Sequence, residues 1–415
     1  MRVLYLTHYF HPEGNAPATR VYELSRRWAA EGHEVTVVTC APNVPSGVVY
    51  EGYANRMWQR ECREGVDVIR VWTYLAANQG TVRRILNYVS YMATATLVGL
   101  FLRRPDVVIA TSPQFFCGWA GVLLSRLRGL RFVLEIRDLW PESISAVDAI
   151  RNRAVVRFLE FLELRLYAAA GRIVTVGDGY RERLEARGVD RARITVIPNG
   201  VDLEAFAPER PAGEREALRR DFDLGDRFVC AYVGTIGMGS GLEVVLRACR
   251  RLRDSGRDDI RFLLVGDGAL REELEAQARA EGLQSVIFTG RQPKARIPEF
   301  LAAVDACLVH LTRSPLFTTV LPSKIFEAAA MRRAIVVGVE GFAARMVSEA
   351  EAGLCMEPEN EGELLRAVER LAVDPDLAKQ LGASGYEKIA LRHSYDGLAA
   401  SYLELLQGGR LGVEN

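Results

Sequence analysis

The chain has 415 residues, and 53 lysines and arginines balance 53 aspartates and glutamates, so the formal net charge is zero. This length predicts two domains rather than one core, and the missing basic excess excludes an ordinary nucleic-acid-binding protein, so no nucleic acid is expected as a partner. Seven cysteines lie singly, without zinc or redox spacing, and the opening residues show no secretory signal, so a reduced cytoplasmic setting without a metal site is expected.

Short apolar runs alternate with helical stretches along the whole chain. The helix expected at 18–32 ends at Gly32, and a last amphipathic helix is expected at 395–407. The first half contains six apolar runs that predict strands, at 2–7, 34–39, 66–72, 106–111, 131–136 and 172–177. The second half repeats the pattern with five, at 228–234, 260–266, 285–290, 306–311 and 334–339.

Alternating strands and helices with continuously apolar strands predict parallel sheets covered on both faces. The fold class is therefore α/β, with two doubly wound, Rossmann-like domains that face a cleft at the carboxyl ends of their strands. We expect domains at 1–200 and 227–393, joined by a linker at 201–226 that is rich in proline, glycine and charge. The helix at 394–407 could pack back on the first domain.

One apolar segment, residues 85–102, lies between two arginine pairs. It is close to the length of a membrane-spanning helix, but Asn87, Ser90 and Thr94 recur at helical spacing and give it a weakly polar face. Two interpretations stay open: a helix buried in the first domain, and a helix resting on a membrane surface with its arginines near lipid phosphates. A true span is the least favoured.

The loop after the first strand, "HYFHPEGNAPATR", contains His8, His11 and Gly14. Gly14 would let the backbone approach a ligand, and the following helix would direct N–H groups at an anion. A long loop without a ligand is the alternative. His8 and His11 are the histidines that we expect to contact an acceptor or a phosphate.

A glycine-rich loop, "GTIGMGSGLE", follows the first strand of the second domain. Its spacing suits a phosphate at a helix N-terminus and involves Gly237, Gly239 and Gly241. It is neither a Walker loop nor a complete dinucleotide fingerprint, so a dehydrogenase is a poor alternative. Two later turns, at Gly266 and at Arg291, could contact phosphate or base or simply reverse the chain.

A lone carboxylate, Glu327, lies in the apolar helix of "LPSKIFEAAAM". Ser323 is the expected N-cap of that helix. A favourable interaction with the helix macrodipole would explain Glu327 without a ligand, but a buried carboxylate needs hydrogen-bond partners, and a ribose diol supplies two donors. With Lys324 able to meet a diphosphate, the stretch predicts a nucleotide-diphosphate site.

These motifs resemble family 4 glycosyltransferases of the GT-B fold over nearly the whole chain. The similarity rests on six stretches: "PEGNAPATR", "GHEVTVVT", "VIPNGVD", "VGTIGMGSGLE", "LLVGDG" and "LPSKIFEAAAM". "IRDLWPES" and "PSKIFE" resemble in particular the fucosamine transferase subgroup of O-antigen and capsule pathways, which moves N-acetylated deoxyamino sugars.

The resemblance implies roles for particular residues and shows departures. Members carry two glutamates eight positions apart; Glu327 matches the second, which binds ribose, whereas Thr319 replaces the first, which contacts the sugar. Thr235 and Ser240 stand near the places of the usual pyrophosphate-binding arginine and lysine, so neutralising the diphosphate would fall to Lys324 and helix N-termini.

In the first domain, the resemblance places a histidine–aspartate pair where this chain has Arg137 and Asp138. Arg137 would add positive charge near a diphosphate. Asp138 and Glu142 would orient acceptor hydroxyls, or form an ion pair with Arg137.

The implied reaction retains anomeric configuration without metal or other cofactor. It would move the sugar of a UDP-sugar to a polyprenyl-diphosphate-linked saccharide, at the inner face of the cytoplasmic membrane or in the cytoplasm. A sugar-nucleotide 2-epimerase and a non-catalytic sugar-nucleotide-binding protein remain as alternatives.

Overall fold

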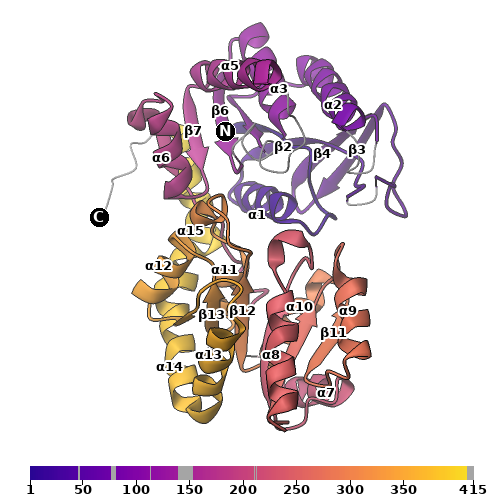
Figure 1. Ribbon diagram of the computed structural model, residues 1–415. Helices are drawn as coiled ribbons and strands as arrows, with labels where there is room; N and C mark the ends of the chain where they lie inside the picture. Colours follow the sequence, from indigo (N-terminus) through magenta and orange to yellow (C-terminus); the bar gives the residue numbers. More distant parts are fainter. Residues whose placement is uncertain are drawn as a thin grey trace. The chain divides into compact units, whose positions relative to one another are not determined.

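The computed structural model describes residues 1–44, 47–75, 81–112, 114–138, 153–209, 211 and 213–408. The chain forms two compact units. The first unit contains Met1–Pro198 and the C-terminal segment from Asp396 onward; the second contains Asn199–Tyr395 (Figure 1). Each unit is an α/β body around its own sheet, which confirms the predicted fold class.

The first unit is built on an eight-stranded sheet in the order β3-β4-β2-β1-β5-β6-β7-β8. Its predicted strands are present, and they pair in parallel because apolar residues fill both faces. The strands are β1 (Arg2–Leu6), β2 (Glu34–Cys40), β3 (Trp58–Arg63), β4 (Val66–Val71), β5 (Val107–Thr111), β6 (Arg131–Ile136), β7 (Arg172–Thr175) and β8 (Ile194–Val196).

Two of these strands were not predicted. β3 is antiparallel to β4 at the edge of the sheet, and its sequence, WQRECR, is polar because its side chains are exposed or half-buried. β8 has three residues, too few to form a recognisable apolar run. The helices of the unit are α1 (Ala16–Ala30), α2 (Thr81–Phe101), α3 (Phe115–Arg128), α5 (Arg153–Ala169), α6 (Asp178–Ala186) and α15 (Tyr395–Gln407).

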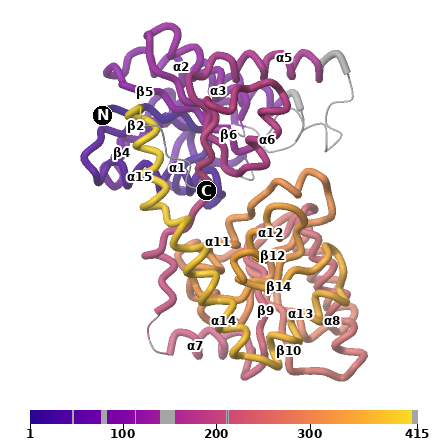
Figure 2. Tube along the Cα trace, turned by 90° about the vertical axis from the view of Figure 1, so that its left-hand side faces the viewer, coloured from indigo at the N-terminus to yellow at the C-terminus, as the bar shows by residue number. Residues whose placement is uncertain are grey.

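The last helix, α15, packs on α1 of the first unit (Figure 2). The indole Nε1 of Trp28 donates a hydrogen bond to the carbonyl of Ala399 over 3.0 Å. The Trp28 ring also meets the edge of the Tyr402 ring, with centroids 5.3 Å apart. The chain therefore returns to the first unit after completing the second.

The second unit has a six-stranded parallel sheet in the order β11-β10-β9-β12-β13-β14. Its first strand, β9, lies between β10 and β12, so the direction of winding reverses between β9 and β12. Ligands of such sheets bind outside the carboxyl ends of the strands at that reversal. The strands are β9 (Phe228–Val233), β10 (Ile260–Val265), β11 (Val286–Gly290), β12 (Ala306–His310), β13 (Ala334–Gly338) and β14 (Gly353–Cys355).

The helices of the second unit cover both faces of this sheet and bury two apolar clusters. They are α7 (Glu214–Asp221), α8 (Glu243–Asp254), α9 (Arg271–Ala280), α10 (Ile297–Ala303), α11 (Lys324–Ala330), α12 (Phe342–Glu349), α13 (Glu361–Val373) and α14 (Pro375–Gly385). Short helical turns, η2 (Met238–Ser240), η3 (Lys294–Arg296) and η4 (Phe317–Thr319), interrupt the loops at the carboxyl ends of the strands.

Candidate functional site

The glycine loop after β9 lies at the reversal point of the second sheet and is held by backbone contacts with the loop after β10. Ile236 donates its N–H to the carbonyl of Asp267 over 3.0 Å, and its own carbonyl accepts from Leu270 over 3.1 Å. A Cβ on Gly266 would lie 2.0 Å from the Gly234 carbonyl oxygen, and Gly266 has a φ of +142°. Gly266 therefore allows two loops to meet, and its role is accounted for without a ligand.

A buried histidine, His310, joins three loops at the same edge. Its Nδ1 lies 2.7 Å from the carbonyl of Ser240, and its Nε2 accepts the N–H of Glu359 over 2.9 Å. This arrangement requires the neutral ring with its proton on Nδ1. Burial lowers the pKa of His310, although the hydrogen bond with the Ser240 carbonyl opposes this shift. The lowered pKa keeps the ring neutral.

His310 also explains two glycines around it. A Cβ on Gly241 would lie 2.9 Å from Cε1 of His310, and one on Gly338 would lie 2.5 Å from Cδ2. Gly241 has in addition a φ of +59°. His310 is thus a positioning residue for the glycine loop, a role that its apolar strand-end position in the sequence did not reveal.

Lys324 begins α11 and lies directly against the glycine loop. Its Nζ is 3.6 Å from the centroid of the Tyr232 ring, on β9, and a Cβ on Gly234 would lie 2.5 Å from its Cε. Burial lowers the pKa of Lys324 to about 7, although Glu327 opposes the shift. Ser323 occupies the N-cap position but makes no capping hydrogen bond with its side chain.

Glu327 lies one turn further along α11, and its neighbours are buried apolar residues. Burial raises its pKa, and the positive charges of Lys294 and Lys324 oppose this rise. Lys294 was missed by the sequence analysis. It belongs to η3, after β11, and the signal that could have found it is that this loop ends at the same sheet edge as the loops already considered.

Gly237, in the glycine loop, is not required by the packing of the unit. Gly237 has a φ of −117°, and a Cβ there would meet only the Thr235 side chain, at 3.7 Å. Neither backbone conformation nor packing within the unit therefore requires glycine at this position. Thr235 and Arg291 are exposed, on the loops after β9 and β11 respectively.

Gly239 and Thr319 lie where the turn η4 approaches the glycine loop. A Cβ on Gly239 would lie 3.2 Å from the ring of Phe317, which begins η4. Thr319 ends η4 and donates its hydroxyl to the Leu316 carbonyl over 3.3 Å. The position of the family's first glutamate is thus filled by a threonine bonded to its own turn.

The histidines of the first unit are more enclosed than the sequence suggested. His8 is 4% exposed and is surrounded by the rings of Tyr9, Tyr88 and Tyr91. Burial lowers the pKa of His8 to about 3, so it carries no charge near neutral pH. His8 therefore offers no positive charge that would attract a phosphate.

The residues before α1 are more open. The His11 ring lies 4.8 Å from that of Tyr22. Gly14 is exposed, and a Cβ there would meet nothing within 4 Å. Asn15 caps α1 by accepting the N–H of Ala18 over 2.9 Å, so the start of this helix is satisfied in part by its own cap.

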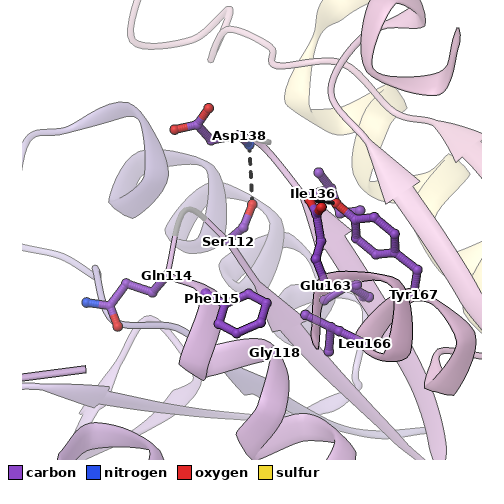
Figure 3. Close-up of a pocket in the computed structure, with 10 residues that line it drawn as sticks. Ser112, Gln114, Phe115, Gly118, Ile136, Asp138, Glu163, Leu166 and Tyr167 are labelled. Carbon is purple, nitrogen blue, oxygen red and sulfur yellow. Dashed lines mark hydrogen bonds between the residues drawn. The ribbon is translucent and has the colours of Figure 1, made fainter. Parts of the chain in front are cut away.

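Arg137 and Asp138 follow β6 in the first unit. The hydroxyl of Ser112 accepts the backbone N–H of both, over 2.7 and 3.3 Å. Asp138 and Ser112 line a hollow whose other lining residues are mostly apolar and come from β6, α3 and α5 (Figure 3). Glu142 lies outside the described residues. Within the described ranges, no cluster of histidine, cysteine, aspartate or glutamate could hold a metal ion.

Comparison with known proteins places these two units in a family. Residues 15–200 match the Glycosyl transferase 4-like domain, and residues 214–388 match the Glycosyl transferases group 1 family. The chain is a glycosyltransferase of this family. Its enzyme class and GT-B fold, expected from the sequence, are thereby confirmed, whereas the fucosamine subgroup is not.

Individual relatives agree with this family assignment. The chain is 28% identical to WcaI of Escherichia coli, assigned to colanic acid biosynthesis, over 90% of this chain and 93% of that one. It is 31% identical to the alpha-D-kanosaminyltransferase of Streptomyces kanamyceticus, over 68% and 73% of the two chains. The fold matches that of Anabaena HepE, solved with UDP-glucose, with a TM-score of 0.72, 17% identity and coverage of 98% and 100%.

Proposed function

We propose that this glycosyltransferase moves an N-acetylated deoxyamino sugar from a UDP-sugar to a lipid-linked saccharide, with retention of anomeric configuration, in the synthesis of a surface polysaccharide. The observation that carries the donor site is the pair Lys324 and Glu327 on one turn of α11, against the glycine loop at the reversal point of the second sheet. A nucleoside diphosphate presents the two groups that such a pair would bind, a diphosphate and a ribose diol.

In this reaction the bond between the anomeric carbon and the diphosphate oxygen breaks, and the leaving oxygen takes the electron pair. Lys324 and the N–H groups of the glycine loop would stabilise the negative charge that develops there. The acceptor hydroxyl forms the new bond, and its proton passes to the leaving phosphate. Glu327 would accept hydrogen bonds from the ribose, so that binding and charge stabilisation come from adjacent residues of one helix.

The relatives support the donor and the pathway. HepE was solved in complex with UDP-glucose, an alpha-D-kanosaminyltransferase is among the relatives, and WcaI is assigned to colanic acid biosynthesis. In the first unit, Arg137 and Asp138 directly follow β6 and Gly14 lies in the loop after β1, on the side of the sheet where an acceptor would bind. A polyprenyl diphosphate acceptor would keep the enzyme at the inner face of the cytoplasmic membrane.

The test of this donor site is calorimetric titration with UDP, GDP and ADP, with and without EDTA. We expect UDP-selective binding that is insensitive to EDTA and weaker in Glu327→Ala by roughly tenfold or more, since a charged hydrogen-bond partner is lost. Glu349→Ala, on the adjacent helix α12, is the control. Unchanged UDP affinity in Glu327→Ala would remove the ribose role.

A non-catalytic sugar-nucleotide-binding protein is the second candidate, and Thr319 favours it, because the acid that contacts the sugar in relatives is replaced. The two are separated by incubating the protein with a UDP-amino sugar and a lipid-diphosphate saccharide. Release of UDP together with an extended saccharide supports transfer. Binding of the UDP-sugar without either product would establish the second candidate, and conversion of the donor sugar alone would indicate an epimerase.

A further inference from the structure

The helices α2, α3 and α5 contribute to one core cluster on the same side of the first sheet (Figure 1), and their outer sides expose many large apolar residues. Among the described residues, eighteen large apolar side chains are exposed, and ten of them belong to these three helices. So dense a group on one face is typical of an interaction surface. We call it the α2–α3–α5 face, and its members are Ile85, Leu86, Leu97, Leu100, Phe101, Leu123, Leu127, Phe158, Phe161 and Leu164.

Helix α2 is oriented with its polar residues toward the protein. Asn87 is buried; the hydroxyl of Ser90 accepts the N–H of Tyr74 over 2.9 Å; and that of Thr94 donates to the Trp72 carbonyl over 2.9 Å. A helix that faces water normally does the reverse. The polar stripe noted in the sequence therefore serves the fold. None of the helices in the described part of the chain is long and apolar enough to span a membrane.

The exposed apolar residues of α2 remain in solvent. Leu97 is 55% exposed and Phe101 is 79% exposed, although both belong to a helix whose other side is packed in the core. Leaving these side chains in water has no structural benefit within the unit. Transfer of these side chains into an external apolar phase would be favourable, because it removes their surface from water.

The ends of α2 and α3 form one continuous, rigid surface. A Cβ on Gly99 would lie 2.5 Å from Cδ1 of Leu124, so the helices are in close contact there. Arg128 donates to the carbonyls of Gly99 and Leu102 over 2.6 and 2.9 Å, which ties the end of α3 to that of α2. Leu127, on the last turn of α3, is thus presented beside the exposed end of α2.

The exposed charge of this face is mostly positive. The sequences of α2 and α3 contain no acidic residue, in a chain with equal numbers of acids and bases, whereas α5 exposes Glu160 together with Arg157 and Arg165. Arg83 and Arg126 are exposed near the ends of these helices, and Arg103, just beyond α2, is exposed and paired with Glu34 over 3.2 Å. Arginines near apolar side chains are the combination that meets anionic phospholipids, whose phosphates attract each charge while acyl chains receive the apolar groups.

We propose that the α2–α3–α5 face docks on an anionic phospholipid bilayer, with Leu97, Phe101 and Leu127 among the inserting side chains. A second copy of the chain is a poorer occupant. A two-fold interface brings the same patch of both copies together, and among the described residues of the three helices Glu160 is the one exposed carboxylate that could oppose their exposed arginines. The proposal extends the proposed function by giving the surface that reaches a lipid-linked acceptor, but bilayer binding needs no donor or acceptor and is tested without them.

The experiment is sedimentation of the full chain with vesicles of phosphatidylcholine alone and of phosphatidylcholine with phosphatidylglycerol. We expect binding to the mixed vesicles that weakens at high salt. Leu97→Ser and Phe101→Ser should each weaken it roughly tenfold, the loss expected for one buried apolar side chain. Arg83→Glu and Arg126→Glu should each weaken it roughly fivefold or more. Matched controls on α13 of the second unit are Val373→Ser and Arg366→Glu, which should leave binding unchanged.

Several outcomes would overturn the proposal. They are no binding to either vesicle, equal loss in the face variants and the controls, and concentration-dependent dimers that disappear in Phe101→Ser. Melting temperature and UDP titration accompany each variant. A face variant that still binds UDP but not vesicles supports the docking surface, whereas wild type that binds vesicles but no nucleotide would leave the docking surface standing and remove the proposed donor site.

Discussion

Charged residues near the carboxyl ends of the strands are buried and paired to different extents in the two units. In the first unit, Arg20 and Glu135 are fully buried and paired over 3.1 Å. Glu135 also accepts the hydroxyls of Tyr5 and Thr111, each over 3.0 Å. In the second unit, Lys324 and Glu327 are only half-buried, and within the described residues neither side chain makes a hydrogen bond.

We propose that this difference separates charge that stabilises the fold from charge that binds a ligand. Burial raises the pKa of Glu135, but Arg20 and Arg137 more than reverse this and hold it below its usual range. At Glu327 the two lysines do not overcome burial, and its pKa stays raised. A carboxylate and an ammonium without full compensation are what a nucleoside diphosphate would complete.

The largest expected effect on stability comes from breaking the buried Arg20–Glu135 pair of the first unit. Arg20→Leu leaves Glu135 buried without its partner, so the free energy of unfolding should fall by about 3–5 kcal/mol. Urea unfolding of the purified chain measures it. Arg103→Leu is the control, because its pair with Glu34 is exposed and should contribute less than about 1 kcal/mol. Equal losses in the two variants would contradict the distinction between the edges.

Replacing Lys324 in the second unit should lower the rate of sugar transfer rather than the stability of the fold. Lys324→Met removes the cation proposed to stabilise the leaving diphosphate, so kcat should fall about 10²- to 10³-fold. Thermal unfolding should be unharmed, because a half-buried ammonium without a hydrogen bond is lost. Lys388→Met, whose exposed Nζ pairs with Glu351, is the control. Wild-type turnover in Lys324→Met would exclude the phosphate role.

Two glycines sharpen the same comparison within the second unit. Gly266→Ala forces a Cβ to 2.0 Å from a carbonyl oxygen at a φ of +142°, and we expect a loss of about 1–3 kcal/mol or more of unfolding free energy. Gly237→Ala meets ordinary contact only, so stability should change by less than about 0.5 kcal/mol. Its UDP affinity should nevertheless fall if the backbone there approaches a phosphate. Chemical unfolding and UDP titration of both variants separate packing from binding.

Most of the parallel strands could be predicted because they are continuously apolar. Lys324 and Glu327 were predicted as site residues because charged residues in an apolar helix are conspicuous. The sequence analysis missed β3, whose polar edge position hides it, and the strands β8 and β14, which have three residues each. It also missed Lys294, since a lysine in a polar loop looks ordinary until the fold brings it near Glu327. The enclosure of His8 was missed for a similar reason, because only the packed rings around it show that it is buried.

The smallest expected effect is a proton linked to nucleotide binding. Because burial lowers the pKa of Lys324 to about 7, the free enzyme loses this positive charge as pH rises through neutrality. A bound diphosphate favours the protonated lysine, so binding should take up a proton, and UDP affinity should fall by up to about tenfold per pH unit above pH 7.

Calorimetry in buffers of different ionisation enthalpy measures this uptake directly. Lys324→Met should remove both the uptake and the slope between pH 7 and 9, whereas Lys388→Met should keep them. The secondary ionisation of UDP itself works in the opposite direction, because deprotonation near pH 6 to 7 makes the phosphate a better ligand for a cation. A slope that persists in Lys324→Met would therefore belong to the nucleotide or to another group, and Lys324 would then act as a permanent charge rather than one acquired on binding.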